Sequence, residues 1–204
     1  MKKGRVAVLL SGRGSNFAAM VRDAREADAN YAVRLVISDQ ESAPGLKKAF
    51  AFGIPGYCLP RENFSDQAAH EQEIVSILEN AGIELVCLAG YMRLVGPVLL
   101  NKCPERIMNI HPSLLPACPG LHAQRQALRH GLKVSGCTVH FVDPGLDSGP
   151  IIAQQAVRVH GDDNEDSLSR RILRQEHRIY PQAIRLYFAG RLQISGRRVI
   201  MAGK

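Results

Sequence analysis

The sequence predicts a single α/β domain with a mostly parallel central sheet, and three observations carry this prediction. Short apolar runs alternate with helix-like segments through the first half of the chain, which is the pattern of α/β folds. The run IELVCLAG at 83–90 is largely apolar and ends at a glycine, as is typical of a buried parallel strand. The chain has 204 residues, of which 46% are hydrophobic and 22% charged, so one domain with a substantial core is expected.

Local signals place the elements of the first half. Pro44 fits the first turn of a helix, where its missing amide hydrogen is not needed. Ser65 can cap the next helix, and Gly82 can end it. We therefore expect strands at 5–11, 33–38, 56–60 and 83–90, and helices at 16–27, 44–53 and 65–82.

The second half departs from this alternation. A long helix is expected over 165–190, with a break near Pro181, because proline removes a helical hydrogen bond. Ser195-Gly196 between two short apolar runs indicates a terminal hairpin. We expect further strands at 106–110, 134–143 and 150–159, and a shorter helix at 120–131. In such sheets ligands bind beyond the carboxyl ends of the strands, so functional residues are expected there.

Composition excludes several classes of protein. The five cysteines are odd in number and form no CxxC pair, which disfavours a disulfide framework and a zinc site. No apolar run approaches the roughly 18 residues of a membrane span. The N-terminal run Val6–Leu10 is shorter than the apolar region of a signal peptide. The sequence therefore predicts a cytoplasmic protein with reduced thiols and no membrane association.

The net charge of +7 raises the question of an anionic partner. Nine of the basic residues lie within 170–204, against one acid, Glu176. Such an excess can attract nucleic acid. However, the arginines are dispersed, and aromatic residues that could stack on bases are only 5% of the chain. We expect no nucleic-acid binding, and favour steering of small anionic substrates; the purpose of the C-terminal arginine excess stays open.

The turn SGRGSN (11–16) joins the first expected strand to the first expected helix. Glycines there allow close approach of an anion, and a helix N-terminus offers free N–H groups. The turn does not match the GxGxxG pattern, because Phe17 stands where the pattern needs its third glycine, and it lacks the Lys-Ser/Thr end of a P-loop. It therefore suits a single phosphate monoester better than a dinucleotide or ATP. The alternative is a tight structural turn capped by Ser15 or Asn16.

Asn109 and His111, in NIHPSLLP, point to one face if 106–111 is a strand, because side chains alternate. A carboxamide and an imidazole that project together could polarise a carbonyl and move a proton. Asp147, in LDSGP, lies in a loop between two expected strands. A carboxylate near His111 would favour the protonated imidazole and orient the ring. Taken singly, the alternatives are a histidine bonded to a turn and a solvated turn acid.

Other candidates are weaker. His140 alternates within TVHFV and is interpreted as a satisfied strand residue, while His70, His130 and His160 are expected at the surface. No GxSxG turn or Ser-His-Asp order indicates a nucleophilic hydrolase. No close cluster of His, Cys and carboxylates indicates a metal site.

Five segments together carry a resemblance: SGRGSN, LAGYMRLV (88–95), NIHPSLLPACPGLHAQRQAL, GCTVHFVDPGLDSGPII and QEHRIYP (175–181). They resemble the phosphoribosylglycinamide formyltransferase family, from about residue 5 to 195 and in the family's order. NIHPSLLP and LDSGP are shared with relatives, whereas GRGSN together with QEHRIYP is specific. The resemblance implies a Rossmann-like formyltransferase fold over 1–204, with helices on both faces of the sheet.

The resemblance also implies an activity and its residues. A formyl group would pass from 10-formyltetrahydrofolate, the co-substrate, to the amine of phosphoribosylglycinamide in purine synthesis, without a metal. Asn109, His111 and Asp147 would be catalytic. The substrate phosphate and ribonucleotide would be bound by Gly14, Ser15, Asn16 and Glu176. Folate would be bound by Met92, Arg93, Leu94, Val95, Asn109, Val142, Asp143 and Asp147.

Two departures and two alternatives accompany the resemblance. Gln67 stands where an arginine is expected at the folate site, with Arg61 nearby, and Ala117-Cys118 stands where relatives often have a basic or aromatic residue. A formyltetrahydrofolate hydrolase would use the same Asn-His-Asp residues with water as acceptor, although it usually carries an extra N-terminal domain. A nucleotide-binding module would not need that triad. A homodimer is left open.

Overall fold

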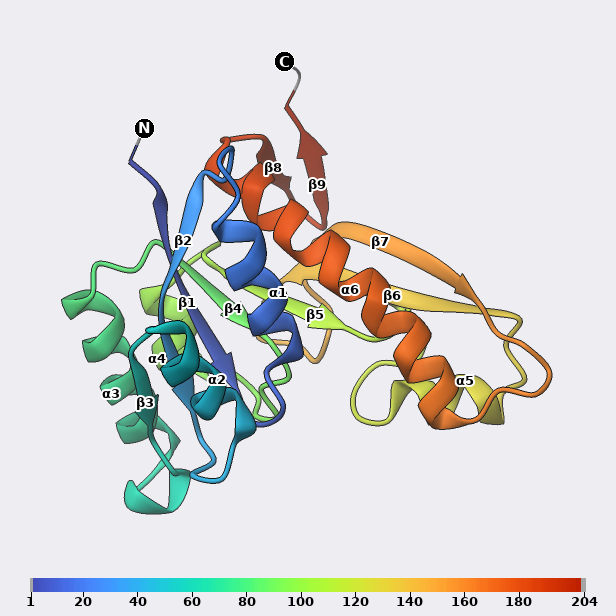
Figure 1. Cartoon of the computed structure of the whole chain (residues 1–204), viewed down its shortest axis with the longest axis horizontal. Coiled ribbons are helices and arrows are strands. Elements are labelled where there is room, and N and C mark those ends of the chain that lie inside the picture. Colours follow the sequence, from blue (N-terminus) through green and yellow to red (C-terminus); the bar gives the residue numbers. More distant parts are fainter. Residues whose placement is uncertain (1, 203–204) are drawn as a thin grey trace. The chain divides into compact units, whose positions relative to one another are not determined.

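The computed structural model describes residues 2–202, which form two compact units that meet in sequence at Asn109 and Ile110. Figure 1 shows the elements of both units. Each unit is built around strands.

The first unit contains a parallel sheet in the order β3-β2-β1-β4-β5. Its central strand β1 is apolar throughout Val6 to Leu10, and all five of these side chains are fully buried. Such continuous burial requires cover on both faces of the sheet. The prediction of a mostly parallel sheet is confirmed. The strands are β1 (Gly4–Leu10), β2 (Tyr31–Ser38), β3 (Gly56–Cys58), β4 (Leu85–Leu88) and β5 (Ile107–His111).

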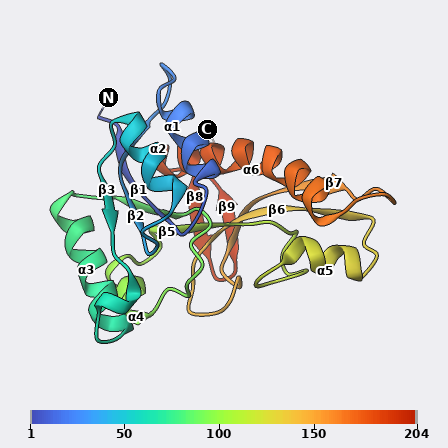
Figure 2. The same ribbon diagram turned by 60° about the horizontal axis from the view of Figure 1, so that its bottom comes forward.

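Helices cover the two faces of this sheet because the chain reverses direction across it. The chain runs from β1 outward to β3, then returns to β4 on the other side of β1, and right-handed crossovers then fall on opposite faces. α1 and α2 contact β2 together, whereas α3 and α4 pack against each other in a separate pair (Figure 2). The helices are α1 (Ser15–Ala24), α2 (Pro44–Phe52), α3 (Gln67–Asn80) and α4 (Pro97–Lys102), with a short 3₁₀ turn at Arg61–Asn63.

Two details of these helices differ from the prediction. The cap of α3 is Asp66 rather than Ser65, because the Asp66 carboxylate accepts a hydrogen bond from the Ala69 amide at 2.8 Å. A carboxylate reaches this amide and also interacts favourably with the helix dipole. The helix α4 was not predicted, since its six residues are too few to show a period in the sequence.

The second unit contains a hairpin-based sheet in the order β6-β7-β9-β8. β6 and β7 pair antiparallel, β7 and β9 parallel, and β8 and β9 form the predicted terminal hairpin. The helix α6 packs on β6 and β7, and α5 packs on α6. The elements are β6 (Val134–Phe141), β7 (Ile151–Arg158), β8 (Leu192–Ser195), β9 (Arg198–Met201), α5 (Ala123–Arg129) and α6 (Glu165–Phe188).

The expected break in the long helix does not occur. α6 runs for 24 residues with Pro181 inside it. Proline within a helix costs about 3 kcal/mol, but Pro181 is buried together with Tyr180 and Ile184 on the face toward the sheet. Burial of that face stabilises the continuous helix. Its start is fixed by a reciprocal capping box between Asn164 and Ser167.

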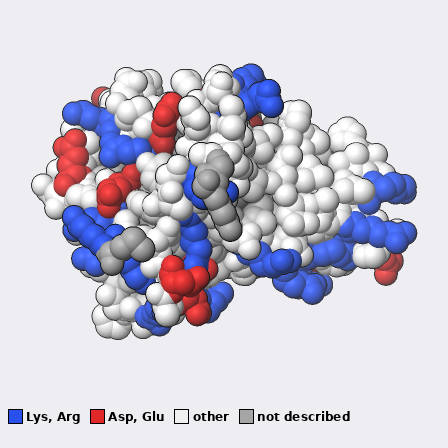
Figure 3. Space-filling model, turned by 90° about the horizontal axis from the view of Figure 1, so that it is seen from above, with Lys and Arg blue, Asp and Glu red and all other residues white. Residues whose placement is uncertain are grey.

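The surface agrees with the basic composition. On the face drawn in Figure 3, Lys and Arg side chains cover more area than Asp and Glu side chains. No helix in the described part of the chain is both long and apolar enough to cross a membrane.

Candidate active site

The glycine-rich turn leads directly into α1. Gly14 is the residue before the helix and adopts a left-handed conformation, with φ of 63°. No side chain caps this helix, so neither Ser15 nor Asn16 serves as the cap that the structural alternative requires. The first amides of a helix have no intrahelical partner. The turn therefore presents backbone donors and a positive dipole, which is the arrangement that binds phosphate.

Close packing explains the glycine at position 14. A Cβ atom there would lie 2.8 Å from the Cα of Gly45, at the start of α2. The Gly45 amide in turn donates to the Gly12 carbonyl at 3.0 Å, and the Lys48 ammonium donates to the Arg13 carbonyl at 2.6 Å. The turn is therefore fixed before any ligand arrives.

The segment Met92–Val95 follows β4, at the carboxyl edge of the parallel sheet. The Met92 amide donates to the Ser11 hydroxyl at 2.9 Å. Arg93 forms an ion pair with the buried carboxylate of Asp39, with 2.6 Å between Nε and Oδ2. Burial raises the pKa of Asp39, but hydrogen bonds from Ser11, Arg93 and Gln40 outweigh it and hold the pKa below its ordinary value. The side chains of Met92 and Leu94 remain largely exposed.

A cavity of about 320 Å³ adjoins this segment. Gln67 donates to the Leu94 carbonyl and to Glu71, so its amide group is already engaged. Arg61 lines the same cavity and supplies a second cation beside Arg93. His70, which was expected at the surface, is buried here, and its Nε2 lies 3.0 Å from the Leu59 carbonyl. The cavity is lined by Arg61, Gln67, His70, Glu71, Tyr91, Met92, Arg93 and Leu94.

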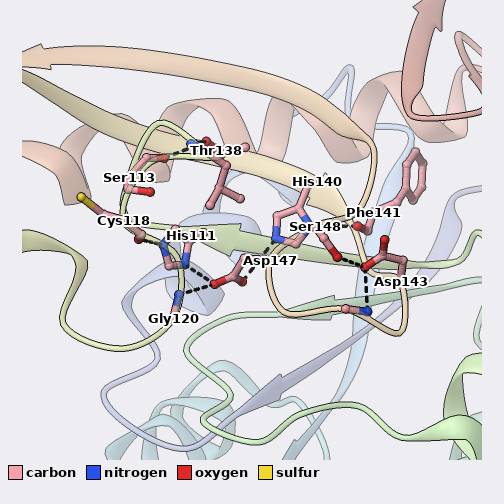
Figure 4. Close-up of polar contacts among 12 residues, drawn as sticks. His111, Ser113, Cys118, Gly120, Thr138, His140, Phe141, Asp143, Asp147 and Ser148 are labelled. Atoms are coloured by element: carbon pink, nitrogen blue, oxygen red, sulfur yellow. Dashed lines mark hydrogen bonds and ion pairs between the residues drawn. The ribbon is translucent and has the colours of Figure 1, made fainter. Parts of the chain in front are cut away.

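His111 lies at the end of β5 and is buried in the second unit (Figure 4). Its Nδ1 lies 3.2 Å from Asp147 Oδ2, and its Nε2 lies 2.8 Å from the Cys118 carbonyl oxygen. Both ring nitrogens therefore face oxygen atoms that can only accept. Only the doubly protonated ring can donate in both directions. The sequence predicted that Asp147 and His111 would meet although 36 positions separate them, and the structure confirms this.

The turn after His111 is fastened to β6 and β7. The Thr138 hydroxyl donates to the Ser113 carbonyl at 2.7 Å and accepts from the Leu115 amide at 3.1 Å. Gln154 donates to the Leu115 carbonyl at 2.9 Å and to the Thr138 hydroxyl at 3.0 Å. Such support fixes the orientation of the residues that it surrounds.

Asp147 has an unusual backbone. Its φ is 49°, a left-handed conformation that few residues other than glycine adopt. Its Oδ2 also accepts from the Gly120 amide at 2.8 Å, which ties the loop to the turn after His111. Gly149 allows this loop to close, because a Cβ there would lie 1.9 Å from the Phe141 carbonyl oxygen. This uncommon conformation and the hydrogen bond to Gly120 together hold the Asp147 carboxylate beside His111.

Asp143, a predicted folate residue, mainly shapes the same loop. Its Oδ1 accepts from the Ser148 hydroxyl at 2.7 Å and from the Gly145 amide at 3.1 Å. Val142 precedes it, directly after β6. The side chain of Asp143 is therefore already occupied within its own loop.

His140 is the residue that sequence reasoning undervalued. Its Nδ1 lies 2.8 Å from the Phe141 carbonyl, as expected of a satisfied strand residue, but its Nε2 lies 3.8 Å from Asp147 Oδ1. Burial lowers the pKa of His140, so the ring is neutral near pH 7. Asp147 is thus flanked by two imidazoles. In the sequence, His140 and Thr138 show only the alternation of a strand. That pattern does not indicate that His140 lies near Asp147.

Glu176 lies on the buried face of α6. Its charge adds to the effect of burial in raising the pKa of the Cys137 thiol on β6 to about 12. The carboxylate therefore points toward the sheet rather than into solvent. Asn109, the remaining predicted residue, is half-buried on β5, two positions before His111.

Comparison with known proteins shows what this chain resembles. The formyl transferase family matches residues 4–184. The phosphoribosylglycinamide formyltransferase of Bacillus subtilis is 44% identical over 185 residues, which cover 91% of this chain and 94% of that protein. The chain also matches the trifunctional purine biosynthetic protein adenosine-3 of Drosophila melanogaster at 44% identity, but it spans only 14% of that protein's length.

Solved structures agree with these relatives. Glycinamide ribonucleotide transformylase 1 from Symbiobacterium toebii has a TM-score of 0.97 and 50% identity, covering 98% of this chain and 95% of that one. A formyltetrahydrofolate deformylase from Pseudomonas syringae is more distant, with a TM-score of 0.90 and 26% identity, and this chain covers 66% of it. The match across most of the chain, at this level of identity, shows that the chain belongs to the formyl transferase family.

Proposed function

We propose that this chain transfers the formyl group of 10-formyltetrahydrofolate to the amine of phosphoribosylglycinamide, as a single formyltransferase domain over 1–204. The observation that carries the proposal is the placement of His111, with one ring nitrogen on Asp147 and the other on the Cys118 carbonyl. This arrangement holds an imidazole between two oxygen atoms in a buried site. It supplies no nucleophile, and a direct transfer to an amine needs none.

The chemistry assigns a task to each catalytic residue. The amine attacks the formyl carbon, the bond from that carbon to the folate nitrogen breaks, and one proton moves from the amine to that nitrogen. The formyl oxygen carries negative charge on the way, and Asn109 and His111 stabilise it as hydrogen-bond donors. Asp147 keeps His111 protonated and helps to move the proton. For His111 to reach the formyl oxygen through Nε2, its contact with the Cys118 carbonyl must open.

Substrate binding would use several segments of the chain. Gly14, Ser15 and Asn16 would bind the phosphate through backbone amides, and Glu176 would hold the ribonucleotide. Met92–Val95 would bind folate on one side, and the loop from Val142 to Asp147 would bind the pterin. We further infer that Arg61 supplies the positive charge that Gln67 lacks, because Arg61 lines the cavity next to Met92–Val95. The enzyme would be cytoplasmic and would act on small molecules alone.

The second candidate is hydrolysis of 10-formyltetrahydrofolate, favoured only by the likeness to the Pseudomonas syringae deformylase. An assay with and without phosphoribosylglycinamide separates the two activities. We expect tetrahydrofolate to form only when the acceptor amine is present, because the phosphate turn and Glu176 would have no purpose in a hydrolase. Comparable release of tetrahydrofolate without acceptor would show that water is the acceptor.

The phosphate site can be tested directly by a crystal structure with phosphoribosylglycinamide. The phosphate should lie within about 3 Å of the backbone amides of Ser15 and Asn16. The positive end of the helix dipole and the backbone N–H groups of the first turn of α1 are the reason. A phosphate bound instead among the arginines of 170–198 would overturn this assignment and would give those arginines a direct role.

A further inference from the structure

Glu71 is a buried carboxylate that no part of the proposed reaction uses. It lies on α3 with 4% of its surface exposed. Three N–H donors point at it: the Gly96 amide, the Leu99 amide at 3.1 Å, and the Gln67 side chain at 3.0 Å. A buried carboxylate without such donors would be costly. The three hydrogen bonds therefore fix the position of the Glu71 side chain.

Two of these donors belong to the start of α4. Gly96 is the residue before that helix, and no side chain of its own segment caps it. Glu71 supplies the missing acceptors from another helix and complements the positive end of α4. A Cβ at position 96 would lie 2.7 Å from Glu71 Oε1 and 2.6 Å from Gln67 Nε2. A side chain at position 96 would therefore displace the ends of Gln67 and Glu71, whereas the φ of −93° is itself open to any residue.

The same contacts reach the segment Met92–Val95. Gln67 connects Glu71 to the Leu94 carbonyl, at 3.1 Å. At its other end the segment is held by the Ser11 hydroxyl on the Met92 amide and by the Asp39 carboxylate on Arg93. Glu71 thus fixes the end of the segment that Ser11 and Asp39 do not reach, and it lines the adjoining cavity.

We propose that Glu71 is a positioning residue that holds Met92–Gly96 in the conformation that binds the formyl donor. This role rests on the proposed function, in which Met92–Val95 contact the folate. Glu71 acts on the segment through the Gly96 amide and through Gln67, so its loss should weaken donor binding more than it slows the chemical step. Preorganisation of a binding segment acts in this way on affinity.

The test is Glu71→Gln, which keeps the size of the side chain but turns an N–H group toward one of the amide donors. We expect the KM for 10-formyltetrahydrofolate to rise about tenfold, with less change in kcat and in the KM for phosphoribosylglycinamide. Glu73→Gln is the matched control, because Glu73 is exposed on the same helix. Equal kinetics for the wild type and Glu71→Gln would overturn the proposal.

A second variant and a second measurement test the role of Glu71 independently of the kinetics of Glu71→Gln. Gly96→Ala pushes the carboxylate away without removing it, and should raise the same KM. Hydrogen exchange should show faster exchange of the Gly96 and Leu99 amides in Glu71→Gln, whatever the enzyme's reaction is. Faster exchange in Glu71→Gln, together with a wild-type protein that transfers no formyl group, would contradict the proposed function alone. Unchanged exchange in Glu71→Gln would contradict the role of Glu71 itself. So would a variant whose melting temperature falls while its KM for the donor stays constant.

Discussion

Replacing His111 by alanine should lower turnover by about 100- to 1,000-fold, the usual cost of losing an oxyanion donor. Asn109→Ala should lower it to a similar extent, since it is the second proposed donor. The measurement is kcat with phosphoribosylglycinamide and 10-formyltetrahydrofolate at saturation. The loss should appear in kcat, because both donors act on charge that develops only during the reaction.

Matched controls separate this effect from general damage. His160→Ala and Asn101→Ala remove the same side chains from exposed positions and should leave kcat unchanged. Circular dichroism and melting curves should show a folded protein for all four variants. A variant at 109 or 111 that turns over at a near-normal rate would remove that residue from the mechanism.

The second large effect is expected from Asp147→Asn. Asp147 Oδ2 meets both the Gly120 amide and His111 Nδ1, so an asparagine with its oxygen in that place keeps both contacts but loses the negative charge beside the ring. Without the carboxylate charge the protonated ring loses its electrostatic partner, so the substitution favours the neutral ring. A neutral imidazole is a weaker donor to an oxyanion than a charged one. Turnover should fall about 100-fold or more.

Two readouts distinguish this explanation from simple loss of structure. Imidazole ¹⁵N spectra should show His111 with two protons in the wild type and with one in Asp147→Asn, at the same pH. Asp162→Asn, at an exposed position of the same unit, should change neither kcat nor the spectra. If the His111 signals are unchanged in Asp147→Asn while turnover falls, Asp147 acts on the proton transfer and not on the charge of His111.

The sequence by itself determined the parallel sheet of the first unit, because buried apolar runs such as Val6–Leu10 have few other stable arrangements. It also determined the glycine-rich turn, since a tight strand-to-helix connection needs a left-handed residue at Gly14. Asn109 and His111 could be paired in advance through the period of a strand. That Asp147 lies beside His111 was implied by the motifs of the formyl transferase family. The chemistry of the two residues alone could only suggest it.

Only the tertiary structure decided the contacts that depend on chain segments far apart in sequence. The proximity of His140 to Asp147 depends on how the loop 142–149 folds back over β6. The role of Glu71 depends on α3 packing against α4, and α4 is too short to leave a periodic signal. Pro181 remains inside α6 because burial against the sheet outweighs a local helix-breaking tendency. Local sequence encodes propensity and alternation, whereas such contacts arise only when separate elements pack together and exclude water.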